Sequence, residues 1–165
     1  MLNIIFIIIG IAVLLLVIVA ALQPADFKIS RSEQIIAPAS AIFPHVNNLR
    51  LWEAWSPWAK LDPHATNTFE GPQAGVGATM HWSGNSKVGV GSMMIVESEP
   101  DDLIKFKLGF IKPMRVTNIS LFSFSSEDGE TKVTWQMTGS NKFMGKLMGL
   151  IMKSDKMVGG QFAHG

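Results

Sequence analysis

The sequence predicts an α+β domain in which a curved antiparallel sheet of about seven strands surrounds a long C-terminal helix, preceded by one transmembrane helix. Three observations predict this arrangement. The chain opens with an uncharged apolar run, continues with short alternating segments bounded by turn residues, and ends with a segment of helical period. With 165 residues in total, we expect an N-terminal anchor over 1–25 and one domain over 26–165.

Composition excludes several classes of protein. Fourteen Lys and Arg against thirteen Asp and Glu give a formal charge of +1, so no broad positive field favours nucleic acid as a partner. The chain has no cysteine, which removes disulfides, thiolate nucleophiles and Cys-based metal sites. The four histidines show no metal-ligand spacing, and no nucleophile motif is present. We therefore expect neither a metal nor a cofactor.

The N-terminal apolar run predicts a single-pass membrane anchor. Leu2 to Leu22 contains no charged side chain, and a helix over this span, at about 1.5 Å per residue, matches a bilayer core of roughly 30 Å. A cleaved signal peptide is the alternative, but its apolar region is usually about 7 to 15 residues long and follows a basic residue. The first charges, Asp26, Lys28 and Arg31, include too few cations to fix the side of the membrane.

The domain itself begins with a strand and two short helices. Phe27 to Ile36 alternates, Pro38 opens a short helix, and Asn47 to Trp52 forms a further helical turn. Asp128-Gly129 is a hairpin signal before the last strand. The remaining segments, each bounded by Gly, Pro, Asn or Asp, form an antiparallel meander of strands at 67–70, 78–83, 92–99, 103–110, 115–125 and 131–138.

The last segment changes to a helical period and predicts a long amphipathic helix. Its apolar face consists of Phe143, Leu147, Leu150, Ile151, Val158 and Phe162. Glycines within it weaken the helix by about 1 kcal/mol each, so packing against the sheet must hold it in place.

A strongly curved sheet closed by a single helix leaves a hollow, and such hollows bind apolar ligands. Alternation within the strands places apolar side chains on one face of the sheet. The residues expected to line the hollow and contact a hydrophobic small molecule are Met80, Trp82, Ile95, Phe106, Leu108, Phe122, Phe124, Trp135, Met137, Leu147, Leu150 and Ile151.

Several motifs together resemble the START-like, or SRPBCC, superfamily, in its bacterial polyketide cyclase/dehydrase and lipid transport branch. The matching stretches, between about Phe27 and Phe162, are Trp52-Glu-Ala-Trp55-Ser56-Pro57-Trp58 with Asp62-Pro63, Gly71-Pro72 with Gly75-Val-Gly77-Ala78, Trp82-Ser-Gly-Asn85, Val88-Gly-Val-Gly91, Glu99-Pro100 and Thr131-Lys-Val-Thr-Trp135. The resemblance implies a helix-grip fold with a hydrophobic cavity. It implies no defined reaction, because the superfamily mixes carriers, receptors and cyclases.

The chain departs from that superfamily in two ways. Anchored members carry Lys before the span, which this chain lacks, so their topology cannot be transferred. Members also continue past the position of Phe162, whereas this chain stops at Gly165. We therefore expect a short, truncated closing helix and a partly open cavity.

Two further motifs have alternative interpretations. The tryptophans at 52, 55 and 58 could bind an aromatic ligand or lie at the membrane interface, but packing of the short helices onto the sheet edge is favoured. Gly75-Val-Gly77 and Gly89-Val-Gly91 lack the remainder of a phosphate loop and are interpreted as turn or bulge glycines.

Glu97 is the one weak candidate for a catalytic residue. If Met93 and Ile95 face the cavity, period two places Glu97 there as well, where a carboxylate could act as a general acid or base. The favoured hypothesis is a membrane-anchored binding or carrier protein for a lipid or polyketide-like molecule, rather than an enzyme. The alternatives are a cyclase or dehydratase using the same cavity, and a structural or stress-response membrane protein with a vestigial pocket.

Overall fold

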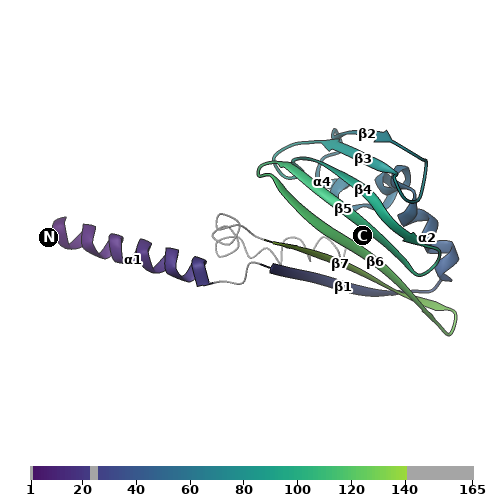
Figure 1. Cartoon of the computed structure of the whole chain (residues 1–165), viewed down its shortest axis with the longest axis horizontal. Helices are drawn as coiled ribbons and strands as arrows, with labels where there is room; N and C mark the ends of the chain where they lie inside the picture. Colours follow the sequence, from purple (N-terminus) through teal and green to yellow (C-terminus); the bar gives the residue numbers. More distant parts are fainter. Residues whose placement is uncertain (1, 23–25, 141–165) are drawn as a thin grey trace.

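The computed structural model describes residues 2–22 and 26–140, without the side chains of residues 2, 3, 12, 13, 20 and 127. Figure 1 shows one N-terminal helix followed by a curved sheet with short helices against it. The helices are α1 (Leu2–Leu22), α2 (Ala39–Asn47), the 3₁₀ turn η1 (Leu49–Leu51), α3 (Trp52–Trp55) and α4 (Pro57–Leu61). The strands are β1 (Asp26–Ile35), β2 (Thr66–Glu70), β3 (Thr79–Ser83), β4 (Val90–Glu99), β5 (Leu103–Lys112), β6 (Val116–Glu127) and β7 (Glu130–Ser140).

The seven strands form one antiparallel sheet in the order β1-β7-β6-β5-β4-β3-β2. Strands β2 to β7 form a meander, and β1 pairs with β7, so the first strand lies beside the last. The predicted α+β class and the seven-stranded curved sheet are confirmed. Strands β2, β4, β5 and β7 extend one or two residues past a predicted end, whereas β1 ends one residue earlier than predicted, β3 begins one residue later, and β6 is shifted along the chain. Pairing, rather than local composition, fixes where each strand stops.

The turn between β6 and β7 forms as the sequence predicts. Asp128 and Gly129 both have positive φ, at 51° and 84°. A two-residue type I′ hairpin requires this conformation at both positions, which explains the Asp-Gly pair.

Helices α2, α3 and α4 lie between β1 and β2 in sequence and pack on one face of the sheet. Helix α2 and the helical turn after it, observed as η1, were predicted, whereas α3 and α4 were not. Pro57 is at the first position of α4, where its missing N–H costs no helical hydrogen bond. That signal was present in the sequence, but no helix was predicted over these residues.

Two predicted helices have different outcomes. The C-terminal helix, with Leu147, Leu150 and Ile151, lies outside the described residues, as does the end of the predicted domain. Helix α1 has the predicted bounds. Within residues 2–22 and 26–140, the part of the chain that the structure describes, no helix is found that is long and apolar enough to span a membrane.

Candidate functional site

One face of the sheet, here called the inner face, carries the core of the domain. Strand register places the same-face residues of neighbouring strands in rows that cross the sheet. One row contains Ile95, Phe106, Ser120, Met137 and Ile29, and the next, beside Met93, contains Leu108, Asn118, Gly139 and Phe27. Most of these side chains are buried, and they pack together as one cluster.

The structure places all nine described ligand-contact candidates on the inner face. Seven of them are buried, and Met80 and Trp82, near the β2 edge, are half-buried. Phe122 and Trp135 are paired across β6 and β7, with ring centroids 4.6 Å apart. The strand alternation thus brings together residues from five strands.

Trp52 fixes the short helices to the centre of this face. Its side chain is only 5% exposed, and its Nε1 donates to the carbonyl oxygen of Val46 at 2.9 Å. Its ring centroid lies 5.4 Å from that of Phe106, 5.9 Å from Phe122 and 6.0 Å from Trp135. The Trp-rich segment therefore packs onto the sheet, as favoured, but at its centre rather than at its edge.

Gly91 makes room for an aromatic contact at the β3 side of the inner face. A Cβ atom at Gly91 would lie 2.5 Å from both the Trp82 ring and the backbone oxygen of Gly109, so a larger residue there would displace the ring and the neighbouring strand β5. The Trp82 and Phe110 ring centroids lie 5.5 Å apart in an edge-to-face arrangement. The Gly89-Val-Gly91 motif thus serves packing at its second glycine.

Two polar residues interrupt the apolar inner face at β6. Ser120 accepts a hydrogen bond from Trp135 Nε1 at 2.8 Å and is 2% exposed. Asn118 is 7% exposed; its Nδ2 lies 3.8 Å from Met137 Sδ, and its Oδ1 has no hydrogen-bond partner within residues 2–22 and 26–140. An unpartnered buried carbonyl costs free energy, and such groups are uncommon in folded proteins.

Sequence reasoning missed this polar pair. Continuing the period-two pattern back from Phe124 and Phe122 reaches Ser120 and then Asn118, two polar residues on an apolar face. The signal in the sequence was therefore that two polar residues fall on a face of β6 that is otherwise apolar.

Glu97 does not share the face of Met93 and Ile95, which corrects the conditional expectation. A bulge between Ile95 and Glu97 sets two residue steps of β4 against one step of β5, so Ile95 pairs with Phe106 but Glu97 pairs with Lys105. Glu97 forms an ion pair with Lys105 on the outer face. Ser98 takes the inner position and donates to Asn47 Oδ1 at 2.9 Å.

Two open hollows lie along the β1–β7 edge within the described part of the chain. One of about 420 Å³ is lined by Ser32, Glu33, Gln34 and Lys132. The other, of about 440 Å³, is lined by Asp26, Phe27, Lys28, Thr117, Ile119, Thr138 and Gly139. Neither includes a residue predicted to contact ligand. No cluster of potential metal ligands is found among the described residues.

Comparison with known proteins shows the fold. No family model matches the chain, and no curated protein matches it in sequence. Among solved structures, protein Mll3558 from Rhizobium loti is similar with a TM-score of 0.57 and 12% identity, covering 84% of this chain and 96% of that one. Protein Ms6760 from Mycobacterium smegmatis is similar with a TM-score of 0.56 and 16% identity, covering 83% and 87%.

A third similar structure is CalU16 from Micromonospora echinospora, with a TM-score of 0.50 and 15% identity, covering 81% of this chain and 74% of that one. At these identities the similarity establishes the fold and nothing further. The described part of the chain matches the helix-grip arrangement that the sequence motifs imply.

Proposed function

We propose that this protein is a membrane-attached binding or carrier protein for an apolar small molecule, held against the inner face of the sheet. The observation that carries the proposal is the unpartnered Oδ1 of Asn118 on that face. An apolar face suits a lipid or polyketide-like body, and a lone acceptor within it suits a ligand that presents one hydrogen-bond donor. The ligand class is therefore an apolar molecule with a hydroxyl or N–H group.

Methionine adds to the case for an adaptable apolar surface. Met80, Met93 and Met137 all project from the inner face, on three different strands. Unbranched methionine side chains adjust to irregular shapes, which suits contact with a flexible ligand.

Binding is proposed rather than catalysis because of where Glu97 lies. The catalytic hypothesis depended on a carboxylate facing the ligand, and Glu97 instead pairs with Lys105 on the outer face. The cyclase or dehydratase alternative therefore has no supporting residue in the described part of the chain.

Membrane attachment is proposed through α1. The helix is 21 residues long with no acidic residue in its first turn and no basic residue in its last. Its large apolar side chains are exposed, Ile4 at 61% and Leu22 at 80% among them. Leaving so much apolar surface in water is unfavourable, so a bilayer is the environment that suits it. The protein would then be single-pass, with the side of its domain unassigned.

Solvent extraction of the purified full chain, followed by mass spectrometry, tests the binding proposal. The expected result is an apolar compound with a donor group, present in near-equimolar amount to protein. Asn118→Leu should retain apolar compounds in general but lose the preference for donor-bearing ones. Preparations that carry no more lipid than the detergent background would contradict the proposal.

A further inference from the structure

We propose that the hairpin between β5 and β6 rests on the surface of an anionic bilayer, as a second membrane contact beside α1. This inference rests on the membrane attachment proposed above. The residues concerned are the loops 84–89 and 111–115, here called the basal loops. Three relationships carry it: the reach of the chain between α1 and β1, the chemistry of the hairpin tip, and the separation of charge along the sheet.

Covalent geometry first brings the basal loops near the end of α1. Only four peptide bonds separate Leu22 from Asp26, so their Cα atoms lie at most roughly 14 Å apart. Asp26 on β1 pairs with Ser140 on β7, and the β6–β7 register places Ser140 level with Thr117. Thr117 in turn pairs with Gly109 on β5, so Asp26 and Gly109 lie at the same level of the sheet. The hairpin beyond Gly109 continues for about three further residues, or roughly 10 Å, toward the same side as α1. Figure 1 shows the β5–β6 turn at the end of the sheet where β1 begins.

The tip of this hairpin has the composition of an interfacial contact. Ile111 is 50% exposed and Met114 is 41% exposed, although both are apolar. Lys112 and Arg115 beside them are also exposed. Apolar side chains that enter the headgroup region, flanked by cations that attract anionic lipids, form the usual pattern of a surface-bound segment.

The other basal loop supports the hairpin and adds a further cation. A Cβ atom at Gly89 would contact the Pro113 ring at 3.8 Å, so the two loops lie against each other. Lys87 in this loop is exposed. Within the described residues, Lys87, Lys112 and Arg115 form no ion pair with an acidic side chain.

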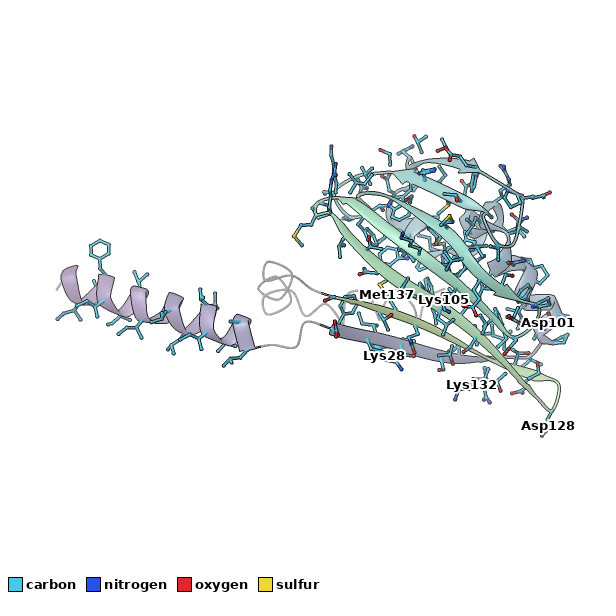
Figure 2. All side chains as sticks on the ribbon, viewed as in Figure 1. Lys28, Asp101, Lys105, Asp128, Lys132 and Met137 are labelled. Carbon is cyan, nitrogen blue, oxygen red and sulfur yellow. The ribbon has the colours of Figure 1, made fainter. Side chains whose placement is uncertain are left out.

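Charge is distributed unevenly between the two ends of the sheet. The basal loops carry Lys87, Lys112 and Arg115, and the acidic residues near them are Asp62, whose Oδ2 accepts from Asn85 N at 2.7 Å, and Asp26 at the start of β1. The turns at the opposite end, 99–102 and 128–130, carry the acidic residues Glu99, Asp101, Asp102, Asp128 and Glu130. Figure 2 shows Asp101 and Asp128 at the end away from α1. A net charge of +1 conceals this asymmetry. An anionic surface would attract the basal end and repel the acidic end, which orients the sheet upright on the bilayer.

Single-cysteine labelling of the full chain tests the inference, because the sequence has no native cysteine. Met114→Cys reports on the hairpin, Asp128→Cys is the matched turn at the opposite end, and Ile8→Cys reports on α1. Each variant carries an environment-sensitive nitrobenzoxadiazole label and is reconstituted in vesicles of phosphatidylcholine with or without phosphatidylglycerol. Ile111→Cys repeats the measurement at a second exposed hairpin position.

The expected result in anionic vesicles is blue-shifted emission at 114 and 111, quenching by bromine-labelled lipid and protection from aqueous iodide. The label at 128 should remain fully accessible to iodide. Lys112→Gln with Arg115→Gln should at least halve the lipid quenching at 114, whereas Lys107→Gln with Lys132→Gln should not change it. In neutral vesicles the lipid quenching at 114 should be weaker than in anionic ones.

Two different results would overturn the inference and are distinguishable. If the label at 8 lies in the bilayer but the label at 114 is as accessible to iodide as that at 128, the hairpin contact is wrong and the anchor stands. If the label at 8 is itself exposed to iodide, the proposed anchor fails, and the hairpin inference fails with it.

Discussion

Asn118 Oδ1 occupies the space that a Cβ atom on Gly139 would fill, on the neighbouring strand β7. The Phe27 ring on β1 borders the same space, 2.8 Å from that Cβ position. A glycine in a strand interior weakens the strand, so its presence here indicates close approach by another group. Gly139 leaves room for a polar amide on a largely apolar face, where its oxygen has no hydrogen-bond partner among the described residues.

Gly139→Ala should therefore destabilise the domain. The added methyl group must displace Asn118 or Phe27, and overpacking of this kind lowers the free energy of unfolding by about 1 to 3 kcal/mol. Urea unfolding of the detergent-solubilised full chain, followed by tryptophan fluorescence, measures the effect. Gly109→Ala is the matched control, because in the described part of the chain a Cβ atom there meets only Ser92 Oγ, at 3.5 Å. An equal loss of unfolding free energy in the two variants would contradict the close approach of Asn118 and Phe27 to Gly139.

Asn118→Ala combined with Gly139→Ala should recover much of the loss. Removing the amide vacates the space into which the new methyl group projects, so the two substitutions should not be additive. A double variant whose loss equals the sum of the single losses would show that the amide and the glycine are not coupled.

Asn118→Leu should leave the stability of the ligand-free domain unchanged or raise it by up to about 2 kcal/mol, because an unpartnered buried carbonyl is removed. Asn118→Asp should instead destabilise the domain, since it buries a charge among apolar side chains. Thermal unfolding of delipidated protein distinguishes these outcomes. A fall of more than about 1 kcal/mol in the leucine variant would mean that Asn118 Oδ1 has a structural partner.

Trp52→Ala should be among the most damaging single substitutions. The ring is 5% exposed and touches Phe106, Phe122 and Trp135, so its loss should cost about 3 to 5 kcal/mol. Trp55→Ala provides the comparison, because Trp55 is only half-buried although it contacts two of the same rings. The free energy of unfolding should fall less for Trp55→Ala, and the reverse order would contradict the packing described.

Glu97→Gln should change the free energy of unfolding by less than about 1 kcal/mol and leave ligand content unchanged. Its partner Lys105 is on the outer face, and half-exposed ion pairs contribute little. Chemical denaturation and the extraction assay measure the two quantities. A loss of ligand in this variant, with stability preserved, would place Glu97 in the binding site after all.

Much of the sheet could be predicted from the sequence because its strands alternate. Phe122 and Phe124, or Trp135 and Met137, are two residues apart, so each pair must share a face. The Asp128-Gly129 turn was equally predictable, because few residue pairs adopt positive φ at both positions.

Glu97 and Asn118 show where that reasoning fails. A bulge reverses the alternation after Ile95, and bulges depend on pairing with a neighbouring strand rather than on the local sequence. The space that Asn118 occupies depends on Gly139, its pairing partner on the neighbouring strand β7. Neither residue alone therefore indicates that a polar amide fits on this face. The asymmetry between basic and acidic ends likewise emerges only once the strand directions are known.

The most direct test of ligand binding at the inner face compares two tryptophan substitutions on opposite faces of the sheet. Leu108→Trp enlarges a buried inner-face residue beside Asn118, whereas Ile119→Trp enlarges an outer-face residue that is 37% exposed. Both variants are purified as the full chain, and bound apolar compounds are quantified by extraction and mass spectrometry, with folding checked by circular dichroism. Folded Leu108→Trp should lose its ligand, and Ile119→Trp should keep the wild-type ligand content. Equal ligand content in the two folded variants would contradict binding at the inner face.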